Sequence, residues 1–213
     1  DAKKSDDMKV LQLNVCSDQE VAQAAEFVKN NLKEPEKGLW GSVNTGMSAF
    51  REVEFTSSHT CKEVEDVNLW GTVRVIKVFL PHIHSHKGRV VNITSMLGRI
   101  ASPSCSSYCL SSFGVAAFSD CLQPEMHRWG ACVLLFEPSN FGATTGILMH
   151  DSIEAQAEEL WSGASKAVQA DYGKPYVTCQ ITLLKSFINS SLTDALASTY
   201  PYPRYSPTEA YWR

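Results

Sequence analysis

The stretch RVVNITSMLGRIASPSCSSYCLSSFG, residues 89–114, decides the fold expected for this chain. Residues 89–95 read as a buried strand that ends in Thr94 and Ser95, and a turn-rich loop then leads to a helix that begins at Tyr108. A hydroxyl at the end of a strand and a phenol thirteen residues later can converge on one substrate oxygen. This arrangement suits redox chemistry on an alcohol or a carbonyl, but the position one helical turn after Tyr108 holds Ser112 and supplies no cation.

Apolar, β-rich runs alternate with segments of helical periodicity along the whole chain. We expect strands at residues 9–15, 39–44, 89–95 and 131–137. We expect helices at residues 17 to about 32, 61 to about 83, 108 to about 130 and 151–170, followed by an extended tail over residues 199–213. Strands without polar alternation, separated by long helices, are typical of a parallel sheet covered on both faces. The sequence therefore predicts a doubly wound, Rossmann-like α/β fold, in one domain over residues 1–213.

Composition excludes several classes of protein. A net charge of −4 argues against a nucleic-acid surface, because phosphate binding needs clustered lysine and arginine. No run of about 18 apolar residues occurs, so no transmembrane segment is expected. The seven cysteines are odd in number and contain no CxxC pair, which favours free thiols in an intracellular, reducing compartment. The spacing of His82, His84 and His86 lets at most two of them face one ion, so we expect no metal site.

Three motifs carry a resemblance to a known family. These are VNLWG at residues 67–71, VVNITS at residues 90–95 and Tyr108 thirteen residues after Ser95. Together they resemble the short-chain dehydrogenase/reductase family. Residues 36–41, 52–57, 67–74, 87–99, 113–122 and 171–174 are more similar still to its mitochondrial D-3-hydroxybutyrate dehydrogenase branch. The resemblance implies a mitochondrial location and an NAD-linked interconversion of 3-hydroxybutyrate, or a similar small 3-hydroxy acid, and its ketone. Family members also assemble through their two long helices, which implies a homo-oligomer.

The resemblance also implies roles for individual residues. Tyr108 would donate a proton to the carbonyl, Ser95 would hydrogen-bond the developing alkoxide, and Asn68 would hold a water of the proton relay. The residues implied to line the NAD site are Asn14, Val15, Asn44, Gly46, Pro138, Ser139 and Thr144. For Arg99 two interpretations stay open, a bidentate contact to a substrate carboxylate and a solvated loop arginine.

The chain departs from the family pattern at positions that touch the cofactor or a partner. Ser112 replaces the lysine expected four residues after the tyrosine, and Ser139 replaces a glycine after the last strand. The motif at residues 43–46 is one residue short of the usual Asn-Asn-Ala-Gly, and Pro124 falls inside an expected helix, where it would break or kink it. No glycine-rich turn that cradles a pyrophosphate occurs, so we expect the chain to lack the first βαβ unit and to be a fragment.

These departures leave three functional hypotheses. The first is a dehydrogenase whose turnover is impaired, since a phenol with a pKa of about 10 exchanges protons poorly without a neighbouring cation. The second is a non-catalytic relative that serves binding or assembly. The third is a member of the retinol or steroid dehydrogenase branches of the same family.

Overall fold

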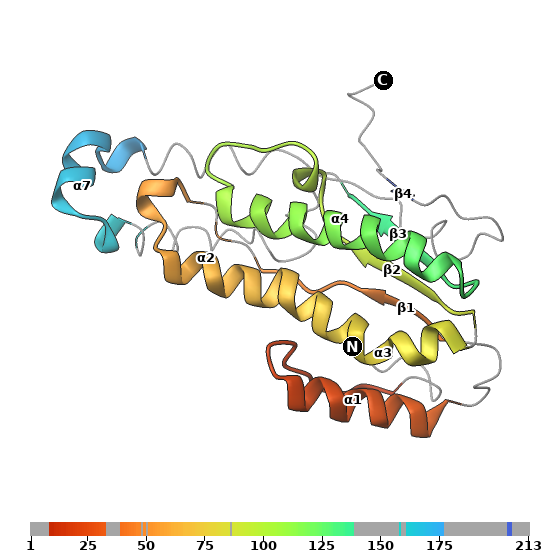
Figure 1. The fold of residues 1–213 in the computed structure, drawn as a ribbon. Coiled ribbons are helices and arrows are strands. Elements are labelled where there is room, and N and C mark those ends of the chain that lie inside the picture. The colour runs from red at the N-terminus through yellow and green to blue at the C-terminus, as the bar shows by residue number, and fades with distance from the viewer. Residues whose placement is uncertain are drawn as a thin grey trace.

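A parallel four-stranded sheet forms the centre of the protein in this computed structural model, which describes residues 9–32, 39–47, 49, 51–85, 87–138, 158, 161–176 and 204–205 (Figure 1). The strands are β1 (Trp40–Val43), β2 (Arg89–Ile93), β3 (Cys132–Phe136) and β4 (Arg204–Tyr205), in the spatial order β1-β2-β3-β4. Val90 of β2 lies opposite Gly41 of β1 on one side and Val133 of β3 on the other. Parallel pairing brings the carboxyl ends of all four strands to one edge of the sheet.

Two long helices, α3 (Gly71–Ser85) and α4 (Ser106–His127), lie against this sheet, and α1 (Asp18–Asn31) packs beside α3 (Figure 1). The shorter helices are α2 (Ser58–Glu65), which packs on α4, and α7 (Lys166–Tyr172), farther along the chain. A π-helical turn, η3 (Asp66–Trp70), joins α2 to α3 in one continuous helix, and two short 3₁₀ turns are η2 (Val53–Phe55) and η4 (Met96–Gly98).

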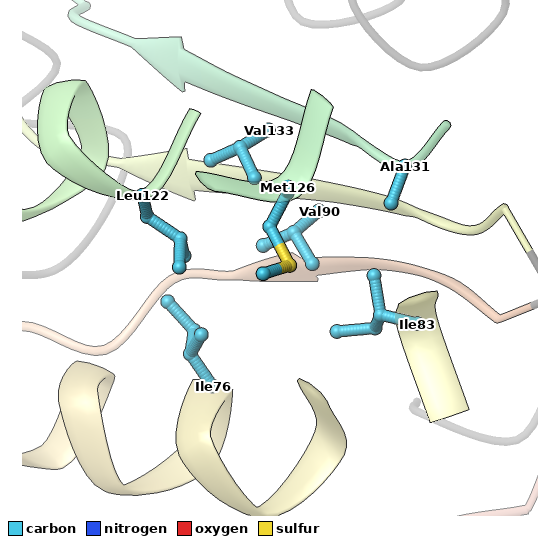
Figure 2. Packing of buried hydrophobic residues seen from close by; sticks show 7 residues of the cluster. All are labelled: Ile76, Ile83, Val90, Leu122, Met126, Ala131 and Val133. Carbon is cyan, nitrogen blue, oxygen red and sulfur yellow. The ribbon is translucent and has the colours of Figure 1, made fainter. Parts of the chain in front are cut away.

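The main core fills the space between α3, α4 and one face of the sheet. Figure 2 shows Ile76 of α3 and Leu122 of α4 converging on the strand side chains Val90 and Val133. The side chains of Val91, Leu134 and Phe136 point to the opposite face and are at most 2% exposed. Both faces of the sheet are therefore covered, as a doubly wound arrangement requires.

The central strands and helices confirm the predicted order of elements. Ser17 caps α1, because its hydroxyl accepts a hydrogen bond from Glu20 N at 3.2 Å. The Glu20 carboxylate, however, accepts from Asn14 N at 2.9 Å, so it fastens the preceding turn instead of completing a capping box. The predicted helix through residues 61–83 is longer than expected and contains the π-turn that the periodicity did not indicate.

One expectation about the other elements was wrong, and two were met in part. Residues 9–15 form no strand, because no neighbour pairs with them in the described sheet, and Val10 and Leu11 remain 64% and 47% exposed. In the predicted helix over residues 151–170, residues 158, 161–163 and 166–170 are helical, the last of them within α7, and the extended backbone of Ser165 interrupts the helix. Residues 151–157, 159 and 160 lie outside the described residues. Within the tail, which was expected only to be extended, β4 pairs with β3 as a strand of the sheet.

Pro124 neither ends nor shortens the helix that carries it. The residue is exposed and lies near the last turn of α4, which continues to His127. A proline removes one backbone hydrogen bond wherever it stands in a helix, but on a solvent-facing surface water can bind the freed carbonyl. The expected break is therefore absent.

Candidate active site

Ser95, Tyr108 and Ser112 meet beyond the carboxyl end of β2. Ser95 is the N-cap of η4, directly after the strand, and Tyr108 lies in the first turn of α4. The hydroxyls of Ser95 and Ser112 both hydrogen-bond the Tyr108 phenol. The structure therefore brings together the two residues implied to be catalytic and the serine that stands in place of lysine.

Burial controls the acidity of the phenol. It raises the pKa of Tyr108 above the ordinary value of 10, because the charged tyrosinate is poorly solvated there. The hydrogen bonds with Ser95 and Ser112 act in the opposite direction but are the smaller effect, and the nearby thiols of Cys109 and Cys105 raise the pKa further. The phenol is consequently protonated at neutral pH and a weak acid.

The loop that carries Ser95 is held against both neighbouring elements. Met96 N donates to Pro138 O at 2.9 Å, which fastens the start of η4 to the segment after β3. On the other side Gly98 lies against α4, and a Cβ built on it would come within 3.0 Å of Ser112 O. A side chain at this position would have to push the α4 backbone by a few tenths of an ångström, so glycine allows the η4 loop to pack closely on α4.

Asn68 is buried in the π-turn and uses its side chain to hold other segments. Its Oδ1 accepts from Met47 N at 2.8 Å, and its Nδ2 donates to Met47 O at 2.9 Å and to Ser111 Oγ at 3.0 Å. The Ser111 hydroxyl in turn donates to Tyr108 O at 2.9 Å. Asn68 therefore connects the loop after β1 with the turn of α4 that carries the phenol, and π-turns are frequent at such functional positions.

The described residues implied to bind the cofactor lie in three segments: the loop after β1, the turn before α1 and the end of β3. Asn44 and Gly46 are exposed after β1, and a Cβ on Gly46 would meet Asn68 Oδ1 at 3.9 Å, so this backbone is open to a ligand. Asn14 and Val15 form the turn before α1, and Pro138 follows β3. Exposed asparagine amides, and a glycine backbone beyond the ends of parallel strands, are suited to contact a dinucleotide. Ser139 and Thr144 lie outside the described residues.

Arg99 is engaged with another protein side chain. Its Nε lies 2.6 Å from Oε2 of Glu137, whose side chain is fully buried, whereas the arginine side chain is 48% exposed. A buried carboxylate needs a cationic partner, which gives Arg99 a structural task. The proposed contact with a substrate carboxylate stays a prediction. Such a contact would have to use the guanidinium nitrogens of Arg99 other than Nε.

Several residues that shape the site gave no signal in the sequence. Ser111 and Glu137 are examples, because a serine in a helix and a glutamate after a strand are ordinary until their partners are known. Arg74 is a third, and it bonds residues in two other elements. Each partner is distant along the chain, so local patterns could not identify these contacts.

Three further predictions concern the histidines, the cysteines and a transmembrane segment. The His84 ring packs on Trp129 with centroids 4.9 Å apart, and His86 lies outside the described residues. The six cysteines in the described part of the chain are free thiols, which does not identify a compartment, so the predicted reducing environment remains a prediction. In the same residues no helix has the length and apolar character needed to cross a bilayer.

Comparison with known proteins gives the same family. A family model described as short chain dehydrogenase matches residues 1–153. Over the whole chain the sequence is 49% identical to "D-beta-hydroxybutyrate dehydrogenase, mitochondrial" of Rattus norvegicus and covers 65% of that relative. It is 33% identical to "Retinol dehydrogenase 7" of Mus musculus, covering 96% of this chain and 66% of that protein. The chain thus spans somewhat less than two thirds of the hydroxybutyrate dehydrogenases that it matches.

Solved structures support the fold. A short-chain dehydrogenase from Streptomyces avermitilis matches 94% of this chain and 71% of its own, with a TM-score of 0.65 at 17% identity. An alcohol dehydrogenase from Thermococcus sibiricus, solved with 5-hydroxy-NADP, matches 94% of this chain and 74% of its own, with a TM-score of 0.63 at 18% identity. The chain is an oxidoreductase-family protein with a Rossmann-like parallel sheet, and it belongs to the short-chain dehydrogenase family.

Proposed function

We propose that this chain is a mitochondrial NAD-linked dehydrogenase of a small 3-hydroxy acid, such as 3-hydroxybutyrate, with turnover limited by Ser112. The substrate and the location follow the mitochondrial hydroxybutyrate dehydrogenase of Rattus norvegicus, 49% identical to this chain. The choice of NAD over NADP follows the resemblance to that branch of the family. The joint contact of Ser95 and Ser112 with the Tyr108 phenol carries the proposal. This contact provides the serine and tyrosine hydroxyls that a dehydrogenase of this family uses, but it does not provide the lysine ammonium.

The residues present account for the proton-transfer half of the reaction. The cofactor would supply the hydride acceptor in oxidation, as NAD, and the hydride donor in reduction, as NADH. The Tyr108 phenol would give its proton to the ketone oxygen in reduction and would have to take one from the alcohol in oxidation. Ser95, held by η4, would hydrogen-bond the same substrate oxygen and stabilise its developing charge.

Replacement of lysine by serine affects proton transfer in both directions of the reaction. An ammonium about 4 Å from a tyrosinate stabilises it by roughly 4 kcal/mol at an effective dielectric of 20, whereas a hydroxyl offers only a hydrogen bond. Oxidation needs the tyrosinate, and the raised pKa of Tyr108 makes that form scarce at neutral pH. Reduction needs the protonated phenol, which is abundant. The abundant phenol does not spare reduction, because both directions pass through the same transition state at a given pH. We therefore expect loss of the ammonium to lower kcat/KM for oxidation and for reduction by the same factor.

The test compares the full-length protein with its Ser112→Lys variant. NADH binding is measured by fluorescence, and acetoacetate reduction and 3-hydroxybutyrate oxidation by the change in NADH absorbance. Ser112→Lys should raise the rate of oxidation by about a hundredfold or more, the usual contribution of a competent general base. It should also move the rise of kcat/KM with pH downward, because the ammonium lowers the pKa of Tyr108.

A matched control is Asn30→Lys, which adds the same charge to an exposed position near the end of α1, outside the site and outside the proposed association surface. This control should leave rates and pH profiles unchanged. Wild-type turnover equal to that of the Ser112→Lys variant would contradict the proposed limitation by Ser112. Tyr108→Phe in the lysine background should abolish the gain, since the phenol is the group being activated.

Ser112 also favours a second candidate, a non-catalytic relative that binds a ligand or partner. The two differ in one measurement: NADH binding with lysine-dependent turnover supports the dehydrogenase, and binding without any turnover in either protein supports the second candidate. Retinol or a steroid as substrate is the remaining alternative, and the same variants assayed with those alcohols would reveal it.

We also propose that α4 and the π-turn take part in association with a second copy of the chain. Three large apolar side chains project from these elements: Trp70 is 52% exposed, Leu110 58% and Phe113 42%. Exposed apolar groups of this size often mark interfaces. Light scattering of the full-length protein should show a dimer or larger assembly that Leu110→Asp dissociates, and a wild-type monomer would contradict it.

A further inference from the structure

Two sets of contacts hold the π-turn η3 from opposite sides. On one side Asn68 bonds Met47 and Ser111, as described above. On the other side the same turn meets the chain at residues 14–17, just before α1. The second set contains a charge cluster that no step of the proposed reaction uses.

Arg74 is the centre of this second set. Its Nη2 donates to Asp66 Oδ1 at 2.7 Å and its Nε lies 3.1 Å from Asp18 Oδ1. Its Nη1 reaches two backbone carbonyls, Asp66 O at 3.3 Å and Val15 O at 3.5 Å. One guanidinium thus joins α1, the turn before it and the π-turn, which its planar array of five donors permits and a lysine ammonium does not.

Asp66 and Cys16 add to the same connection. The hydrogen bond from Arg74 is the first cause that lowers the pKa of the Asp66 carboxyl, so this group is ionised at neutral pH. Burial, followed by a hydrogen bond with Asp66, raises the pKa of Cys16, which keeps the thiol protonated. The carboxylate therefore accepts hydrogen bonds from both Arg74 and Cys16.

Steric fit reinforces the charge cluster. A Cβ built on Gly71, the residue directly after the π-turn, would come within 2.8 Å of Val15 Cγ2. The Val15 side chain therefore lies on the backbone at the start of α3, at a distance that only glycine allows. The position of the turn at residues 14–17 is set by both polar and van der Waals contacts with the helix that carries Asn68.

We propose that Arg74 is a positioning residue that fixes the Asn14–Val15 turn relative to the Asn68 turn, and so sets the distance between the adenine end of a dinucleotide and the catalytic hydroxyls. The proposal rests on the proposed dinucleotide-dependent function, in which Asn14 and Val15 face the adenine. Arg74 can set this distance because α1 and the π-turn are separate elements of the chain. Among the residues described around Arg74, no other charged side chain bonds both elements. Arg74 itself does not need to touch the ligand.

The experiment measures ADP-ribose and NADH binding to the full-length protein by calorimetry, beside free energies of unfolding in urea. Arg74→Met should weaken the binding of both ligands about tenfold, a change that corresponds to about 1.4 kcal/mol. Arg74→Lys, which keeps the charge but reaches fewer partners, should fold normally and lose part of the affinity. Arg128→Met is the matched control, because Arg128 is exposed near the end of α4 and its Nε bonds only the local carbonyl of Glu125 among the contacts described for it.

A purely structural role predicts a different result. Both Arg74 variants would then lose stability while the folded protein bound ADP-ribose with wild-type affinity, and this outcome would overturn the positioning role. If Arg74→Met does not fold, unchanged ADP-ribose affinity in Arg74→Lys overturns it equally. A wild-type protein that binds neither ADP-ribose nor NADH would overturn the proposed function as well, so the two failures are distinguishable.

Discussion

Replacing Asn68 by alanine tests whether the π-turn holds the site together. The Asn68 side chain makes three hydrogen bonds, and the residue is 6% exposed. Met47 is partly exposed, so water can replace its two bonds at little cost. Ser111 is fully buried, and its oxygen would lose the donor from Asn68, a loss that costs about 1–3 kcal/mol. With the small cavity added, we expect Asn68→Ala to lower the free energy of unfolding by about 3 kcal/mol.

A double-mutant cycle isolates the buried bond from the rest of this loss. Ser111→Ala alone should cost about 1–2 kcal/mol, since its hydroxyl also donates to Tyr108 O. The double variant should be more stable than the sum of the two single changes predicts, by about 1 kcal/mol, because the interaction is lost only once. Urea unfolding followed by tryptophan fluorescence gives each free energy. An Asn68→Ala cost below about 1 kcal/mol, or additive single effects, would refute the reasoning.

Three further changes test other contacts. Ile76 is 1% exposed in the main core, so Ile76→Ala should cost about 2–5 kcal/mol in urea unfolding, and a smaller loss would mean that the core closes around the change. A Cβ on Gly114 would come within 2.8 Å of Leu69 Cδ2, so Gly114→Ala should bring none of the gain of about 1 kcal/mol expected from helix propensity. A hydrogen bond to Glu54, and then burial, raise the pKa of Tyr172 to about 12. The stabilisation from this contact is therefore complete below pH 10 and is lost as pH rises toward 12, which the tyrosinate absorbance difference between wild type and Tyr172→Phe should show.

The strands and long helices could be predicted because their signals are local. Buried apolar runs such as residues 89–93 and 132–136 identify central parallel strands wherever their neighbours lie. Residues 9–15 have a similar composition but form no strand, since a strand also needs a partner. Residues 204–205 show the reverse, because this two-residue strand depends on β3 and not on its own composition. The π-turn has no recognised sequence signal, because it is defined by backbone hydrogen bonds such as that of Gly71 N with Asp66 O.

The active site likewise contains contacts that could be predicted from the sequence and contacts that could not. Ser95 and Tyr108 could be placed together because one ends a strand and the other begins a helix at the same edge of the sheet. The contacts of Arg99 with Glu137, and of Arg74 with Asp66 and Asp18, depend on how separate elements pack. A sequence read alone gives the charge of these residues but not their partners. The structure therefore adds most for these two residues. It gives Arg99 a buried carboxylate partner, and it identifies Arg74 as a residue that joins separate elements.

Ser112 can differ from the family lysine without disturbing the scaffold, because the scaffold does not use its side chain. The bond between α4 and the π-turn runs through Ser111, and the close approach of Gly98 is to the backbone carbonyl of Ser112, which every residue at this position shares. The Ser112 hydroxyl contacts the phenol, so loss of the lysine affects the acidity of Tyr108 and leaves the packing in place. A single substitution back to lysine therefore meets an intact frame, and this separation of frame from chemistry makes the rescue experiment decisive for the function.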